Sequence, residues 1–370
     1  MEFRAISGLG HLSLVILSLF GFRHLSLANA SAPSLVTSAT IAGQTISPTL
    51  FELKMAPSAN EPLAWLNGQF IPASQAKLPV TDLGLVHGAS VTEMTRSFQQ
   101  AWYRLDDHLR RLETSLTTTG WNIPYALPEL SIIAEKLLAH NARLLPAGHE
   151  LGLIQFVTAG QNLTYLGAAR REECCRPTVC CHTFPLPCEL WAEKYTLGQH
   201  LLIPNIRQIP GECLSPAMKH RSRLHWLLAD AQVRERDPQG TAILVDAKGD
   251  LTETSAGNFF LVKDNSILTP RPKSILGGIS RYVVFLLAEE LGIPVAVADI
   301  QPLEVRRASE AFTSSTPYCL LPVTRFEGQT VGNGQPGPVY QRLLEAWGQK
   351  VGCDIAAQMR QIAEERMQSP

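Results

Sequence analysis

The chain has no excess of charge of either sign. Its 32 Lys and Arg residues and 33 Asp and Glu residues leave a formal net charge of −1. Binding of a polyanion such as nucleic acid needs a positive field, so we expect no nucleic-acid partner. The sequence also has no apolar run of the roughly 18–20 residues that a membrane-spanning helix requires, so we expect no integral membrane protein. Eight cysteines in 370 residues are too dilute for a small disulfide scaffold.

Apolar residues are abundant enough to form buried cores. Hydrophobic residues make up 45% of the chain and charged residues 18%, whereas disordered chains are poor in the former and rich in the latter. At roughly 150 residues per domain, the length predicts two folded domains. We expect an N-terminal extension over 1–60, a smaller domain over 61–185, a larger one over 186–350, and a polar C-terminal helix or tail over 351–370.

The first sixty residues show no sustained periodicity. Residues 12–20 are mostly apolar, and Ala-Asn-Ala at 28–30 is similar to the cleavage site of a secretory signal. Arg23 fits such a signal poorly, and Met55 is an alternative start of the chain. The many unpaired cysteines favour a reducing compartment. We therefore expect a cytoplasmic protein, with export left open by the signal-like segment.

The hydrophobic pattern predicts hairpins mixed with helices. An Asn-Gly turn at 67–68 predicts a hairpin, and leucines spaced three and four apart over 105–116 predict an amphipathic helix capped by Asp106 and Asp107. Because the strands come in hairpins, we expect an α+β fold with mixed sheets rather than a doubly wound parallel sheet. Further strands are predicted at 153–157, 178–183, 242–246, 251–254, 258–262 and 267–269, and helices at 280–291 and at 219–235, the latter with Leu224, Leu227, Leu228 and Ala231 on its buried face.

Three segments carry polar groups that a core does not need. Lys219 opens a predicted helix, where it is either a solvated charge or, if burial or a neighbouring cation lowers its pKa, an amine nucleophile. Glu253 ends a predicted strand before a loop of small residues, and is otherwise an ordinary carboxylate at a sheet edge. Gly277 and Gly278 precede a helix start at Ser280, where free N–H groups suit a phosphate, although paired glycines also occur in plain turns.

The order of these segments matches the needs of pyridoxal 5′-phosphate, which requires an amine, an anion at its ring nitrogen and a phosphate cup. Residues 64–345 resemble the class IV, fold-type IV pyridoxal-phosphate enzymes: branched-chain aminotransferase, D-amino-acid aminotransferase and aminodeoxychorismate lyase. The matching stretches, in order, are 65–68, 87–96, 107–112, 219–220, 251–260, 269–270, 278–281, 309–316, 322–323 and 334–338.

The resemblance implies a two-domain fold with the cofactor in the inter-domain cleft, and a homodimer. It implies that Lys219 holds the cofactor covalently and moves a proton, and that Glu253 pairs with the ring nitrogen. The implied phosphate ligands are Arg111, Ile279, Ser280 and Thr316; Arg111 is otherwise an exposed helix arginine. The implied activity moves an amino group between a small amino acid, with branched-chain amino acids among the candidates, and a 2-oxo acid. The alternatives are an aminodeoxychorismate lyase and a non-catalytic binding relative.

Departures from the family pattern leave the substrate open. Ala159 stands where the D-amino-acid enzymes carry a carboxylate-binding arginine, and Leu224 where the branched-chain enzymes carry a tyrosine. Pro317 has no N–H to offer a substrate carboxylate. The candidate substrate-binding residues that remain to compensate are His87, Arg96 and Tyr318.

A thiol-rich stretch raises the question of zinc. Its cysteines do not show the usual C-x2-C spacing, and residues 178–187 are typical of a strand followed by a Pro-rich turn. We therefore expect no metal, and buried or free thiols at Cys174, Cys175, Cys180, Cys181 and Cys188, with His182 among them.

Overall fold

The structure is a computed structural model that describes residues 60–166 and 176–368. The expected extension, up to residue 59, and Cys174 and Cys175 lie outside the described residues. Within them, no helix is both long enough and apolar enough to cross a membrane.

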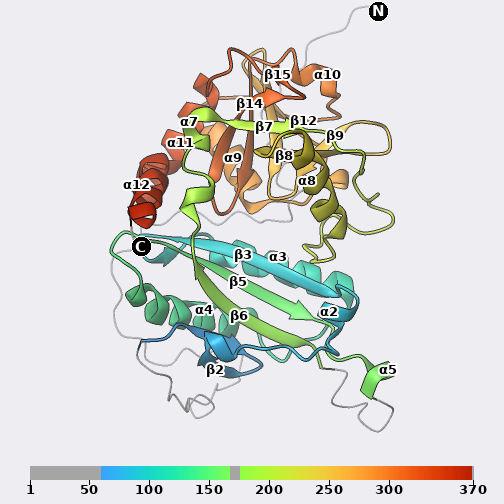
Figure 1. Cartoon of the computed structure of the whole chain (residues 1–370), viewed down its shortest axis with the longest axis vertical. Coiled ribbons are helices and arrows are strands. Elements are labelled where there is room, and N and C mark those ends of the chain that lie inside the picture. Colours follow the sequence, from blue (N-terminus) through green and yellow to red (C-terminus); the bar gives the residue numbers. More distant parts are fainter. Residues whose placement is uncertain (1–59, 167–175, 369–370) are drawn as a thin grey trace, which may run out of the picture. The chain divides into compact units, whose positions relative to one another are not determined.

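The first sheet has six strands, all paired antiparallel, and two helices pack against it (Figure 1). Its order is β2 (Gln69–Pro72), β1 (Leu63–Leu66), β6 (Thr178–Pro185), β5 (Leu151–Thr158), β3 (Ser90–Phe98) and β4 (Ala101–Trp102). The two helices are α3 (Leu105–Thr119) and α4 (Leu127–Asn141). Short segments between them are η2 (Ala73–Gln75), α2 (Leu83–Val86), η3 (Ala142–Leu144) and α5 (Leu163–Leu166).

Helix α3 buries the predicted leucine face, but its predicted cap is wrong. Leu105, Leu109, Leu112 and Leu116 are all buried. The N-cap is Arg104, in the left-handed region at φ 54°, and it makes no side-chain cap hydrogen bond. Asp106 and Asp107 lie inside the first turn, where their charges favour the positive end of the helix dipole instead.

The second sheet has nine strands and closes on itself. Its order is β12 (Val295–Ala298), β11 (Ser266–Pro270), β10 (Asn258–Lys263), β13 (Glu310–Ser315), β14 (Cys319–Phe326), β7 (Gln199–Leu202), β8 (Gly240–Val245) and β9 (Leu251–Thr254), with β15 (Gln329–Thr330) beside β14. Strand β9 also pairs with β10, with Glu253 opposite Asn258, which closes a small barrel. Parallel pairs, such as β7 with β8, occur beside antiparallel ones, so the expectation of mixed sheets in an α+β fold is confirmed.

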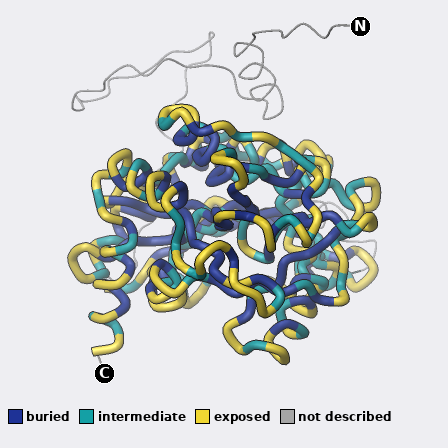
Figure 2. Tube along the Cα trace, turned by 90° about the horizontal axis from the view of Figure 1, so that it is seen from above, coloured by how far each residue is buried: buried dark blue, intermediate teal, exposed yellow. Residues whose placement is uncertain are grey.

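Alternation along the barrel strands separates two cores. On β10, Phe259 and Leu261 face the barrel interior, whereas Phe260 and Val262 belong to a larger core. Helices α9 (Ile279–Glu290), α11 (Pro338–Val351) and α12 (Ile355–Gln368) complete that larger core. Figure 2 shows buried stretches of chain in the interior of the molecule and exposed stretches around them. The remaining short helices are η5 (Cys188–Leu190), α7 (Lys194–Leu197), η6 (Pro272–Ser274) and α10 (Pro302–Val305).

Helix α8 (Leu224–Arg236) differs from its prediction in both start and face. It begins five residues after the predicted start at 219, because residues 219–221 pair with β3 instead. Its buried residues are Trp226, Ala229 and Val233, which pack on β7 and β8. The predicted face is therefore exposed: Leu224 by 66%, Leu227 by 64% and Leu228 by 48%. The leucine face and the face with Trp226 and Ala229 both have helical spacing, so the spacing does not decide between them. In the structure the face with Trp226 and Ala229 packs on the sheet.

Candidate active site

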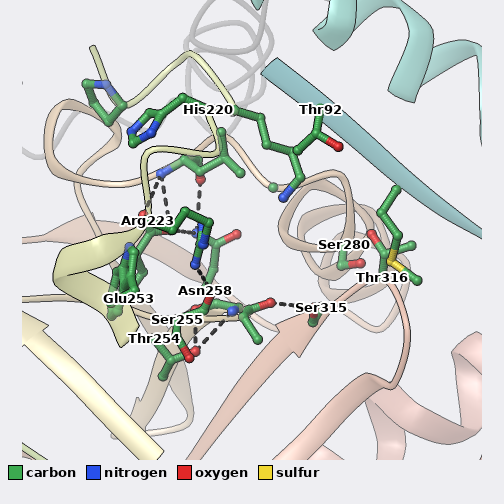
Figure 3. A pocket seen from close by; sticks show the side chains of 18 of the residues that line it. Thr92, His220, Arg223, Glu253, Thr254, Ser255, Asn258, Ser280, Ser315 and Thr316 are labelled. Carbon is green, nitrogen blue, oxygen red and sulfur yellow. Dashed lines mark hydrogen bonds between the residues drawn. The ribbon is translucent and has the colours of Figure 1, made fainter. Parts of the chain in front are cut away.

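A cavity of about 410 Å³ lies where elements of both sheets meet. The first sheet and its helices contribute Thr92 from β3 and Arg111 from α3. The barrel side contributes Glu253, the start of α9 and the turn between β13 and β14. Figure 3 shows Ser280 and Thr316 close together on one side of this cavity, with Glu253 and Asn258 on another.

Lys219 lies on an extended segment held against the free edge of β3. The Thr92 N–H donates to the Lys219 carbonyl at 2.8 Å, and the Arg221 N–H donates to the Ser90 carbonyl at 2.8 Å. The edge is available because β4 covers only residues 97 and 98 of β3. Burial and the charge of Arg111 lower the pKa of Lys219 to about 8. The neutral amine that a nucleophile requires is therefore far more populated near neutral pH than in an ordinary lysine.

Glu253 lies at the seam where β9 meets β10, and neutral donors surround it. Both of its oxygens accept from the Leu276 N–H, at 3.2 and 3.1 Å, and Oε2 accepts from Asn258 Nδ2 at 3.2 Å. Burial raises its pKa to about 7. Among the described residues no side chain forms an ion pair with it. A protonated ring nitrogen would supply the missing positive charge.

The start of α9 offers free backbone donors to the same cavity. Ile279 and Ser280 are its first residues, and Gly278 before them provides no side-chain cap. A Cβ at Gly278 would lie 2.0 Å from Asn258 Oδ1. Glycine at position 278 therefore allows the backbone to pass close to the seam that carries Glu253 and Asn258. These N–H groups, the Ser280 hydroxyl and Thr316 suit a phosphate.

Arg111 is fixed by Glu93, a buried residue to which the sequence reasoning assigned no role. Its Nε and Nη2 donate to the two Glu93 oxygens, each at 2.7 Å, and Nη1 donates to the Gly277 carbonyl at 2.8 Å. Burial alone would raise the pKa of Glu93, but Arg111 and His108 outweigh it and lower that pKa to about 2. The guanidinium carries five N–H donors, so two remain for a ligand. An acidic residue inside an otherwise buried strand was the signal in the sequence.

The three candidate substrate-binding residues do not line the cavity. His87 is exposed, at the C-terminal end of α2. Arg96 is 1% exposed, and its guanidinium donates to the Pro317 carbonyl at 2.9 Å and to Gln358 Oε1 at 3.1 Å. Tyr318 is buried, with its hydroxyl 3.1 Å from Thr313 Oγ1. Basic side chains that do line the cavity and were not predicted as ligands are His220, Arg221, Arg223 and His225. Burial lowers the pKa of His220 to about 4 and also lowers that of His225, which favours their neutral forms.

The described part of the thiol-rich stretch consists of buried free thiols. Cys180 and Cys181 lie on β6, and Cys188 lies in η5. Burial raises the pKa of Cys180 to about 12 and that of Cys188 to about 11, so these thiols stay protonated and are poor metal ligands. Over residues 60–166 and 176–368, no cluster of three or more metal-ligating side chains occurs.

Comparison with known proteins agrees with this geometry. Residues 90–326 match the family model for amino-transferase class IV. A Methanocaldococcus jannaschii protein provisionally named a branched-chain-amino-acid aminotransferase is 31% identical over 296 residues, which is 78% of this chain and 98% of that protein. The D-alanine aminotransferase of Bacillus licheniformis is 28% identical over 284 residues, 76% of this chain and 94% of that protein.

A solved structure supports the same assignment. The crystal structure of the T.th. branched-chain amino acid aminotransferase with pyridoxamine 5′-phosphate aligns with a TM-score of 0.70 and 25% identity, over 79% of this chain and 94% of that chain. The chain therefore belongs to the class IV aminotransferase family. It is a pyridoxal-phosphate-dependent transaminase, as the resemblance of its motifs implied.

Proposed function

We propose that the protein transfers an amino group between a small apolar amino acid and a 2-oxo acid, with Lys219 as the catalytic amine. The observation that carries this proposal is the meeting of Lys219, Glu253 and the start of α9 around one cavity. The pKa of about 8 at Lys219 suits an amine that both attacks a carbonyl carbon and accepts a proton.

Each predicted cofactor ligand receives a role in this proposal. Glu253 would face the ring nitrogen and keep it protonated, and pyridoxal phosphate, when bound, would supply the electron sink for the reaction. The phosphate is held by Arg111, the N–H groups of Ile279 and Ser280, and Thr316. The Lys219 amine, when not bound to the cofactor, carries the proton to and from the substrate carbon.

The wall of the cavity formed by the first sheet favours a small apolar side chain. Met94, Ile154 and Phe184, from β3, β5 and β6, line it together with Trp191. The relatives named above act, by their names, on branched-chain amino acids and on D-alanine. Both substrate classes have small apolar side chains, so we propose the same for this chain.

An assay with purified holoenzyme tests this function. L-leucine, L-valine, L-alanine and D-alanine are each supplied with 2-oxoglutarate, and glutamate is measured; aminodeoxychorismate is supplied separately and p-aminobenzoate is measured. We expect glutamate from at least one apolar amino acid, and none from the Lys219→Ala variant. Release of p-aminobenzoate without transfer of any amino group would contradict the transaminase proposal and favour the lyase. A protein inactive in both arms would favour a non-catalytic relative.

We also propose that the protein is a homodimer. Leu224, Leu227 and Leu228 leave a contiguous apolar face exposed on α8, and a face of this kind marks an interaction surface. Helix α8 directly follows the segment that carries Lys219. A second copy packed on this face would therefore lie close to the active site and stiffen it.

The domain division belongs to the same proposal. We propose a smaller domain over 61–185 and a larger one over 186–350, with the cavity between them. In support, the strands of the six-stranded sheet lie between Leu63 and Pro185, and those of the barrel sheet lie between Gln199 and Thr330.

The cytoplasm is the compartment we propose. The cysteines within residues 60–166 and 176–368 are free thiols, four of them buried, which a reducing compartment preserves. Mass spectrometry of the mature N-terminus tests this proposal: removal of a segment ending near residue 30 would contradict it.

A further inference from the structure

The substrate carboxylate needs a cation in the cavity, and the residues expected from the sequence do not provide one. An amino acid and a 2-oxo acid both carry a carboxylate beside the reacting carbon. His87, Arg96 and Tyr318 do not line the cavity, and Pro317 has no N–H. Arg111 does line it, but the proposed function assigns its two remaining N–H donors to the phosphate. His220 and His225 also line it, but burial lowers their pKa values and favours their neutral forms. The candidates that remain are the two arginines that follow Lys219, Arg221 and Arg223.

Arg221 lies on the same segment as Lys219 and two residues beyond it. This segment is held to β3 on both sides of the bridge between His220 and Val91. Lys219 and Arg221 both line the cavity beside this bridge. The charge of Arg221 also contributes to the lowered pKa of the Lys219 amine.

The guanidinium of Arg221 is oriented by one hydrogen bond and is otherwise uncommitted. Its Nη2 donates to Thr92 Oγ1 at 3.2 Å, and Thr92 is a buried residue of the cavity wall, labelled in Figure 3. Among the described residues, no carboxylate forms an ion pair with Arg221. A planar guanidinium with several free N–H donors matches the two oxygens of a carboxylate.

Arg223 serves a different part of the site. Its Nη2 donates to the Ser255 carbonyl, and its guanidinium carbon lies 5.7 Å from the Trp226 ring centroid. Its charge interacts with that of Glu253, at the end of the cavity proposed to face the ring nitrogen. Arg221 and Arg223 therefore act at two separate places, and only Arg221 shares its wall with Thr92.

We propose that Arg221 binds the carboxylate of the amino acid and of the 2-oxo acid, and so restricts the enzyme to substrates that carry one. Thr92 is the positioning residue that holds the guanidinium in the cavity. This inference rests on the proposed function. It explains how the chain recognises a carboxylate although Ala159 and Pro317 lack the groups that the related enzymes offer.

A carboxylate that has no amino group can bind but cannot react. Its binding therefore measures the contact between Arg221 and the carboxylate separately from the reaction. The probe is 4-methylvalerate, titrated into holoenzyme and followed by the tryptophan fluorescence of the cavity. We expect Arg221→Gln to weaken its binding about 10- to 100-fold, the range for loss of a charged hydrogen bond, and Arg221→Lys to restore part of it. Thr92→Val should weaken binding severalfold with the charge kept. The matched control is Arg234→Gln, an equal loss of charge at an exposed position on α8, which should bind as the wild type does.

Kinetics provide the second measurement. With an amino acid and 2-oxoglutarate, Arg221→Gln should raise KM about 10-fold or more, with kcat changed less, while the absorbance of bound cofactor and the melting temperature stay at wild-type values. Binding of 4-methylvalerate within twofold of wild type by Arg221→Gln, with transamination retained, would overturn this inference and leave the proposed function standing. A wild-type protein that binds cofactor but transfers no amino group would overturn the proposed function itself.

Discussion

At the scale of single residues, the site is built from ionisable groups whose pKa values are moved by burial and by neighbouring charges. Lys219 sits among cations, which favours its neutral amine, and its pKa falls to about 8. Glu93 sits between Arg111 and His108, and its pKa falls to about 2. At Glu253 burial outweighs the charges of Arg223, Lys219 and Arg281, and the pKa rises to about 7. The unpaired carboxylate therefore points to a positively charged ligand, and the paired one has a structural task.

The unpaired state of Glu253 predicts a pH-dependent stability of the cofactor-free protein. A buried carboxyl group with a raised pKa contributes stability below the unfolded pKa of about 4.5 and loses that contribution as pH rises through about 7. The Glu253→Gln variant has no charge to bury. We expect it to match the wild type near pH 4.5 and to be more stable by roughly 1–3 kcal/mol above pH 7, as measured by urea unfolding at both pH values.

The same variant should lose function. Without the carboxylate the ring nitrogen loses its counter-charge, and we expect kcat to fall about 100-fold or more. An apoprotein that shows the same stability difference at both pH values, or a Glu253→Gln holoenzyme with wild-type kcat, would contradict the role given to this carboxylate.

At the scale of elements, the site depends on close approaches between segments distant in sequence. Gly278 allows the start of α9 to pass the Asn258 side chain at the β9–β10 seam. Alanine is compatible with the φ of −66° at this position, so its cost is the clash alone. We expect Gly278→Ala to displace the first N–H groups of α9 and to weaken cofactor binding about 10-fold or more, measured by titration of the apoprotein.

The neighbouring glycine provides a matched control. A Cβ at Gly277 meets nothing within 4 Å, so Gly277→Ala should bind the cofactor within about twofold of wild type. Equal effects of the two substitutions would show that general loop stiffness, and not the approach to Asn258, sets the affinity.

Arg96 is a positioning residue that joins three elements. From β3 it donates to the Pro317 carbonyl in the turn between β13 and β14 and to Gln358 on α12. This turn also carries Thr316, which lines the cavity. We expect Arg96→Met to lower the free energy of unfolding by roughly 2–4 kcal/mol, because buried carbonyl and amide oxygens lose their donor, and to raise the cofactor dissociation constant. The control is Arg110→Met, at an exposed position on α3, with a stability change below about 1 kcal/mol.

The sequence predicts the elements of this fold better than the contacts between them. The hairpins, β5, β6 and α9 follow from local turn chemistry and periodicity, and the structure confirms them. The start and the buried face of α8 do not follow from local sequence. The start is set by the pairing of residues 219–221 with β3, which is a contact between distant segments. Arg96 shows the same limit, since a lone arginine on a strand does not reveal that its acceptors lie on α12 and in the β13–β14 turn. The interpretation of Lys219 and Glu253 rests on the order of the polar segments and on the family resemblance, because either residue alone is more often an ordinary surface or sheet-edge charge.

At the scale of the whole molecule, the exposed face of α8 predicts the oligomeric state. Replacing Leu227 by Glu places a charge in the middle of the apolar face, and burying it in an interface would be costly. We expect the wild type to have the mass of a dimer by light scattering and Leu227→Glu to shift toward the monomer, with lower activity at low protein concentration. Glu235→Ala, at an exposed polar position of the same helix, is the control. A monomeric wild type would refute the homodimer.

The covalent attachment of the cofactor tests the central claim most directly. Holoenzyme is reduced with borohydride, digested, and the peptide that carries the cofactor mass is sequenced by mass spectrometry. The account predicts one modified peptide, with the cofactor on Lys219, and no modified peptide from Lys219→Ala. Attachment at another lysine, or full transaminase activity in Lys219→Ala, would contradict it.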